Sequence, residues 1–271
     1  MMISNIFINL LSLLIFLIFV FISFLDLTRN NRLFKNLFLS SLLFSFVGYL
    51  VSFLSISQGS YNIITIVLFL SLSLLLGIYL VFCFFNFNFI KLRVLFIPYF
   101  FILIAFCYLS FLIKQDTSTN NIQLFENNFL TFHIILSMLS YSFLTVSAIS
   151  SISAFLQQKN LKKSGISYNN HFEIFPSIYE SEKATILLLY VTQFFLFLSL
   201  ITGYFYSLKL SGSLSFFSDY KFTLSLITFL LIFLLLIIRH YLGLTGKKIF
   251  NVVLLSFLFI NVAYFGFKLI K

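Results

Sequence analysis

The sequence predicts an all-α, polytopic integral membrane protein, a helical bundle with about eight transmembrane helices. Two observations lead to this fold class. Of the 271 residues, 61% are hydrophobic and only 9% are charged, whereas an average globular domain carries about 25% charged residues. The hydrophobic residues also fall into separate runs, each close to the roughly 20 residues that a spanning helix needs. A soluble fold cannot bury this much apolar surface, so the expected environment is a lipid bilayer.

The apolar runs follow one another with short polar connections. No Lys or Arg precedes the first run and no small-residue cleavage site follows it, so we interpret it as a span and not as a signal peptide. Pro98 lies near the start of the fourth run, where a helix tolerates proline. The expected spans are Ile3–Leu25, Leu37–Ser57, Ile63–Phe85, Val94–Ile113, Leu130–Leu156, Thr185–Ser207, Phe222–Ile238 and Ile249–Leu269. We divide them into an N-terminal half, 1–127, and a C-terminal half, 128–271.

The fifth span is unusually rich in small residues. Ser147 with Ser151, and Ser150 with Ala154, have the small-xxx-small spacing that lets two helices approach closely. This pattern predicts that the fifth helix is central to the bundle. The longest loop on the inner side is expected to follow it, from about Gln157 to Glu182.

Basic residues are distributed unequally between the two sides of this topology. Of the 17 Lys and Arg residues, the eight-span arrangement places about twelve on one side and about five on the other. The positive-inside rule then puts both termini on the outer, periplasmic side of a bacterial inner membrane. The net charge of +10 is therefore explained by membrane orientation, and no nucleic-acid partner is expected.

The chemistry of soluble enzymes is not visible in the sequence. It contains no Gly-rich phosphate loop, GxSxG, HExxH or CxxC pattern, so we expect no enzyme. Charged residues deep within the spans are also lacking, which argues against an ion-coupled transporter.

Three histidines are candidate functional residues. We interpret His171 as a loop residue and His240, at the inner end of the seventh span, as an interfacial anchor. His133 lies about one turn inside the outer end of the fifth span, and spacing of four puts Ser137 and Tyr141 on its face. An imidazole at this depth needs a partner. It is either a structural residue or an axial ligand to a porphyrin metal.

Several short segments, taken in order, resemble the cytochrome c assembly family. They are His133–Leu144 with Leu156–Lys162, Phe175–Glu182, Phe197–Gly203, Asp219–Lys221 with Ser225–Phe229, and Tyr241–Lys248 with Val262–Gly266. The resemblance covers about 128–271. It implies a membrane protein that binds haem and takes part in cytochrome complex biogenesis with other membrane proteins.

The resemblance also implies a set of haem-binding residues. His133 would be the metal ligand on the outer face, with Tyr141 on the same helix face. Tyr220 would pack against the macrocycle, and Lys221 would pair with a haem propionate. Asp219 would orient Lys221 or cap the seventh helix.

Two features differ from the haem-handling members of that family. The outer loop Ser211–Lys221 contains no Trp, and no second histidine on the outer face follows it. The chain in this respect is closer to the short HemX/YpjD branch. The alternative function is therefore a non-haem accessory or regulatory membrane subunit, and a small-solute or ion transporter is a third possibility.

Overall fold

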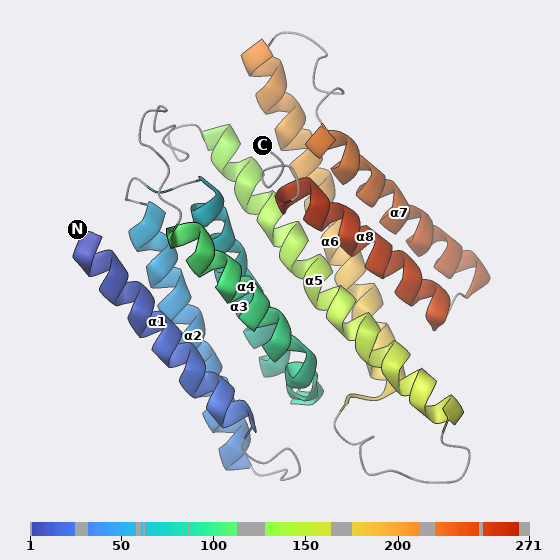
Figure 1. The fold of residues 1–271 in the computed structure, drawn as a ribbon. Helices are drawn as coiled ribbons and strands as arrows, with labels where there is room; N and C mark the ends of the chain where they lie inside the picture. The colour runs from blue at the N-terminus through green and yellow to red at the C-terminus, as the bar shows by residue number, and fades with distance from the viewer. Residues whose placement is uncertain are drawn as a thin grey trace. The chain divides into compact units, whose positions relative to one another are not determined.

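A computed structural model describes residues 2–24, 32–57, 61, 63–85, 87–112, 128–163, 175–211, 220–243 and 246–265. These ranges form eight α-helices and one short 3-10 helix, with no β-strand among them (Figure 1). Each of the eight helices is long and apolar enough to cross a membrane. The predicted all-α membrane fold is thus confirmed, and the orientation of the termini stays a prediction.

The helices keep the predicted order, and their bounds differ mainly where polar residues extend an apolar run. The elements are α1 (Met2–Phe24), α2 (Arg32–Ser57), α3 (Ile63–Phe85), the 3-10 helix η1 (Phe87–Leu92), α4 (Arg93–Leu112), α5 (Asn128–Lys163), α6 (Ile178–Ser211), α7 (Tyr220–Leu242) and α8 (Lys247–Phe265). A helix hydrogen-bonds its own backbone, so it can continue past the hydrocarbon layer into polar sequence.

The expected loop from Gln157 to Glu182 is wrong at both ends. Residues 157–163 continue α5, and α6 begins at Ile178. The early start of α6 has a local cause, because Ser177 and Glu180 form a reciprocal capping box. The amide of Glu180 donates to the Ser177 hydroxyl and the amide of Ser177 donates to the Glu180 carboxylate, each at 3.2 Å.

The chain forms two compact units, which we describe separately. Unit 1 contains residues 1–122 and 169–176, and unit 2 contains residues 123–168 and 177–271. In unit 1, α1 packs on α2, α2 on α3, and α3 on α4. Its interior is dominated by buried aromatic rings in mutual contact, among them Phe16, Phe38, Tyr79 and Phe100.

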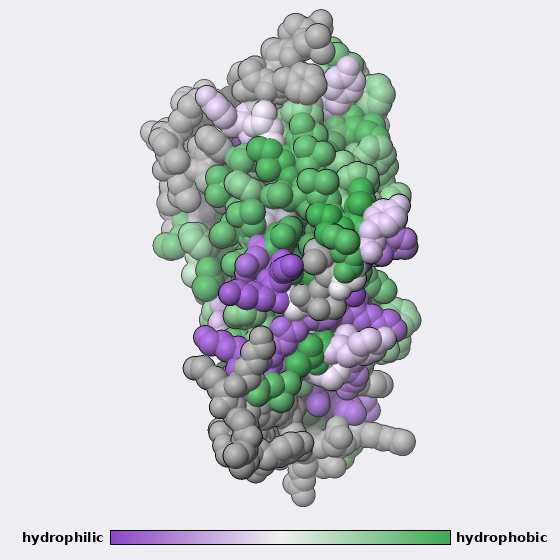
Figure 2. All heavy atoms as spheres, turned by 90° about the vertical axis from the view of Figure 1, so that its right-hand side faces the viewer, coloured by the Kyte–Doolittle hydropathy of each residue, from purple (hydrophilic) through white to green (hydrophobic). Residues whose placement is uncertain are grey.

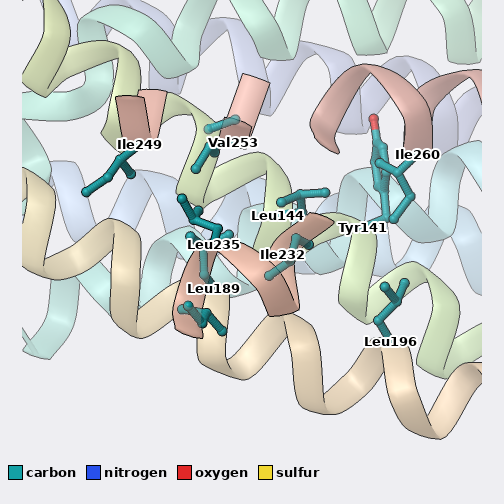
Figure 3. Close-up of a cluster of buried hydrophobic side chains, with 11 residues drawn as sticks. Tyr141, Leu144, Leu189, Leu196, Ile232, Leu235, Ile249, Val253 and Ile260 are labelled. Atoms are coloured by element: carbon teal, nitrogen blue, oxygen red, sulfur yellow. The ribbon is translucent and has the colours of Figure 1, made fainter. Parts of the chain in front are cut away.

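In unit 2, α5 packs against both α6 and α8, while α7 packs against α6 and α8. Buried side chains from all four helices meet in one hydrophobic core (Figure 3). Tyr141 and Leu144 come from α5, Leu196 from α6, Ile232 from α7 and Ile260 from α8. Each helix of unit 2 thus packs against two others, and the central place of the fifth helix in the whole bundle stays a prediction.

The small residues of α5 lie in its contact with α6. The Ser147 hydroxyl donates to the Thr185 carbonyl at 3.1 Å, and the Ser150 hydroxyl donates to the Ser181 carbonyl at 2.9 Å. Ser147 and Ser150 are fully buried. In a bilayer such bonds between helices add to close packing, because no water competes for the polar groups.

Large apolar side chains are exposed along the outer surfaces of the helices. On α7 these include Ile227, Leu230, Phe233 and Leu234. One face of the molecule shows hydrophobic residues gathered over its upper part and hydrophilic residues across a band below them (Figure 2). Exposed apolar surface of this extent is what a lipid bilayer covers, and the protein is a multi-pass membrane protein.

Candidate functional site

His133 lies in the second turn of α5, at the end of unit 2 where α5 begins, α6 ends and α7 begins. Its side chain is half-buried against the last turns of α6. The ring nitrogen Nδ1 is 2.9 Å from the carbonyl oxygen of Ser199. The hydroxyl of Thr202 lies 3.5 Å from the same nitrogen and also donates within its own helix.

Gly203 provides the space for the imidazole. A Cβ atom added at this glycine would lie 2.9 Å from Cε1 of His133 and 3.1 Å from Nδ1. Any larger residue at position 203 would therefore displace the ring. This contact was not predicted from the sequence, although Gly203 closes one of the segments that resemble the cytochrome c assembly family.

The hydrogen bond to Ser199 determines which ring nitrogen carries the proton. A carbonyl oxygen can only accept, so Nδ1 of His133 must be the donor. In a neutral imidazole the lone pair then lies on Nε2. Both polar contacts of the ring use Nδ1, so Nε2 is the nitrogen with which His133 can bind a ligand.

Tyr141 is two turns further along α5, on the side of the core. It is 1% exposed, and its hydroxyl donates to Oδ1 of Asn261 at 3.3 Å. Its ring meets that of Tyr264 edge to face, with centroids 5.9 Å apart. These contacts join α5 to α8, and a role of Tyr141 toward a cofactor stays a prediction.

The remaining predicted residues lie at the start of α7. Tyr220 is its first residue and is 68% exposed, and Lys221 follows it and is also exposed. Asp219 lies outside the described residues. The structure thus places Tyr220 and Lys221 at the same end of unit 2 as His133, whose hydrogen-bond contacts are with α6.

The described residues at this end offer one histidine as a possible ligand of a metal. Within the described ranges, no three His, Cys, Asp or Glu side chains gather as a metal site would require. His240 lies at the other end of α7 and is exposed. A ligating histidine usually donates its second ring nitrogen to a carbonyl or carboxylate, and His133 is held in this way by Ser199.

A second polar cluster, not foreseen from the sequence, lies at the opposite end of unit 2. One carboxylate oxygen of Glu182 accepts from the Gln158 side chain and from the Gly246 amide, both at 2.9 Å. Gly246 has a φ of 67°, and a Cβ there would lie 2.8 Å from Oε1 of Gln158. The cluster joins α5, α6 and the turn before α8. The rings of Phe155 and Phe250 stack with their centroids 4.3 Å apart, and both residues are close in sequence to members of the cluster.

Comparison with known proteins decides the family. The family described as cytochrome C assembly protein matches residues 60–271. The chain belongs to the cytochrome c assembly family. The match is wider than the resemblance over 128–271, since it also includes α3 and α4. Membership in the HemX/YpjD branch stays a prediction.

One curated relative is an "Uncharacterized 28.8 kDa protein in nifR3-like 5'region" from Azospirillum brasilense. It is 32% identical over 138 residues, which are 51% of this chain and 50% of the relative. The match thus spans about half the length of that relative, whose name assigns it no activity. No solved structure matches the chain.

Proposed function

We propose that this member of the cytochrome c assembly family binds haem, with His133 as an axial ligand through Nε2, and acts in the biogenesis of a cytochrome complex. The main observation in support is the bond from Nδ1 of His133 to the Ser199 carbonyl. It leaves Nε2 as the coordinating atom, in the manner usual for ligating histidines. Haem, when bound, supplies an iron that an imidazole nitrogen can coordinate.

The residues around His133 have distinct tasks in this proposal. The Ser199 carbonyl fixes the tautomer and the direction of the ring. Gly203 leaves the space that the ring occupies. Lys221, exposed at the start of α7, offers a positive charge to a haem propionate, and Tyr220 offers an aromatic surface to the macrocycle. Asp219 keeps its predicted role as a cap or as a partner of Lys221.

The proposed activity is binding, not catalysis. The chain would act in a bacterial inner membrane with both termini on the outer side, so that His133 lies near the outer surface. Its partners would be other membrane proteins of cytochrome biogenesis. The family and the excess of basic residues predicted for the other side support these assignments.

A haem titration tests the proposal. The purified full-length protein in detergent is mixed with haemin, and the Soret absorption is followed. We expect a saturable Soret band that His133→Ala removes. His240→Ala is the matched control, because this exposed histidine lies at the opposite end of unit 2, and it should leave the band unchanged.

Two results would contradict the haem assignment. The first is that the wild-type protein gives no saturable band, and the second is that His133→Ala gives the same band as the wild type. Either result would favour the alternative function, a non-haem accessory membrane subunit. Crosslinking in membranes followed by identification of the captured protein would then be the informative measurement.

A further inference from the structure

Arg93 is a buried cation in unit 1, outside the site described above. It is the first residue of α4 and is only 5% exposed. Its Nε atom is buried and has no hydrogen-bond partner in the part of the chain that the structure describes. The described residues of unit 1 include no Asp or Glu. A guanidinium keeps its charge in proteins, so the described part of unit 1 supplies no carboxylate that could balance the charge of Arg93.

An aromatic ring lies against the guanidinium but cannot neutralise it. Its central carbon lies 4.9 Å from the centroid of the Phe34 ring. The Phe34 ring contacts that of Phe38, which contacts Tyr79, and the Tyr79 ring contacts that of Phe96. A ring face attracts a cation through its quadrupole, and the low dielectric of such surroundings strengthens the attraction for any anion that arrives. The hydroxyl of Tyr79 is already bonded to the Phe89 carbonyl.

The position of Arg93 also indicates where an anion would come from. It lies within the apolar span Asn88–Phe111, close to its beginning. Lys91, on η1, is exposed two residues before it, and Lys35 is half-buried on α2 near Phe34. Basic pockets between transmembrane helices at the level of the headgroups bind anionic lipids. The planar guanidinium suits this task because two parallel N–H groups can bind one phosphate.

We infer that Arg93, set on the Phe34 ring where α2 and α4 begin, is the centre of a binding site for a phosphate group supplied by an anionic lipid headgroup. Lys91 and Lys35 add positive charge at its rim. The site is independent of haem and lies in the other unit of the chain, so it can exist whether or not His133 binds haem.

Lipid binding to the full-length protein tests the inference. Native mass spectrometry in detergent would count bound phosphatidylglycerol, with phosphatidylcholine as the zwitterionic comparison. We expect Arg93→Gln to weaken phosphatidylglycerol binding about tenfold, as expected for a lost charge-assisted pair. Lys91→Gln removes an exposed charge and should change binding by only about twofold, the size expected for a screened surface charge. Equal binding by wild type and Arg93→Gln would overturn the inference.

A competition separates the two sources of phosphate. Inorganic phosphate at about 10 mM should not displace the lipid, because Arg93 lies within an apolar span and is only 5% exposed, and the headgroup arrives from the bilayer plane. Displacement would show that the site takes soluble phosphate and would overturn the lipid assignment. Phe34→Leu provides a second variant in case Arg93→Gln does not fold. It keeps the charge, removes the ring beneath it, and should weaken lipid binding a few-fold.

Three acids of unit 1 are rival partners that the sequence offers, and all lie outside the described residues: Asp26, Asp116 and Glu173. Asp26 is tested first, and Asp116→Asn and Glu173→Gln are tested in the same way. If Asp26 were the counter-ion, Asp26→Asn and Arg93→Gln would lower the melting temperature equally, and the double variant would lower it no further. Phosphatidylglycerol would then stabilise the wild type and Arg93→Gln alike, which would overturn the inference. We expect instead that phosphatidylglycerol raises the melting temperature of the wild type and of Asp26→Asn but not of Arg93→Gln.

Discussion

At both ends of unit 2 a glycine lies against a polar side chain, but the two polar groups differ in how fully they are hydrogen-bonded. At each end a glycine leaves room for a polar side chain from α5, namely Gly203 for His133 and Gly246 for Gln158. At the Glu182 end, the carboxylate accepts hydrogen bonds from the Gln158 side chain and the Gly246 amide, so the members of the cluster bind one another. At the His133 end, the contacts of the imidazole with described residues use Nδ1. A cluster whose members bind one another serves stability, whereas a ring with one nitrogen left over can serve binding.

The largest effect on stability is expected for Glu182→Ala. The variant removes the acceptor of two hydrogen bonds to a charged group, each worth about 1.5 kcal/mol, so the free energy of unfolding should fall by about 3 kcal/mol. Unfolding by SDS in mixed micelles, followed by circular dichroism, measures this change. Glu182→Gln keeps one acceptor oxygen and should lose less. A loss below about 0.5 kcal/mol for Glu182→Ala, the range of ordinary surface changes, would show that this end is no stabilising clamp.

The next effect concerns the glycine of the same cluster. Gly246→Ala forces a residue with a side chain into a left-handed conformation and pushes its Cβ against Gln158, and we expect a loss of about 2 kcal/mol. Gly243→Ala is the matched control, because Gly243 has a φ of 59° and no atom within 4 Å of an added Cβ. It should lose only the conformational part, about 1 kcal/mol. The same unfolding assay applies, and equal losses would mean that the contact with Gln158 contributes nothing.

A smaller effect is expected at the start of α6. Ser177→Ala removes one half of the capping box and should cost about 1 kcal/mol. Ser40→Ala on α2 is a control, since this hydroxyl is exposed and donates only to a carbonyl of its own helix. If both variants unfold at the same SDS fraction as the wild type, the capping box does not define the start of α6.

The smallest effect on stability, and the sharpest test of the comparison, is expected for Gly203→Ala. Alanine favours the helix by about 1 kcal/mol relative to glycine, which offsets the displacement of His133, so the unfolding free energy should stay nearly constant. The Soret titration should nevertheless show weaker haem binding, because the added Cβ moves the ring away from Ser199. Unchanged haem binding would show that the position of the ring does not matter.

The fold was predictable because the membrane requires long apolar runs, and these are visible in any single sequence. The bounds of α3 agree with the prediction, while those of α5 and α6 extend into polar residues that hydropathy alone assigns to a loop. α6 begins at Ile178, before the expected start at Thr185, because Ser177 and Glu180 form a capping box there. Hydropathy does not contain this local signal.

The candidate site was predictable only in part. The depth of His133 in an apolar run indicated that it needed a partner, but nothing local could name Ser199, which is distant in sequence and contributes a backbone atom. The glutamate cluster escaped notice for the same reason, since it joins Gln158, Glu182 and Gly246 across three elements. Likewise, the expected fourth span begins at Val94 and leaves Arg93 outside it, whereas in the structure Arg93 begins α4 and lies against Phe34 of another helix.

The two serine bonds between α5 and α6 have a mechanical consequence. The hydroxyls of Ser147 and Ser150 donate to carbonyls of α6 that are one helical turn apart. If α6 slides along α5 or turns about its own axis, both hydrogen bonds are lost. The two bonds therefore favour motion of the two helices together, along the roughly 54 Å spanned by the 36 residues of α5. A partner that pushed on the Glu182 end would tilt both helices at once. His133 and Ser199 would then travel as a pair, with the hydrogen bond between them intact.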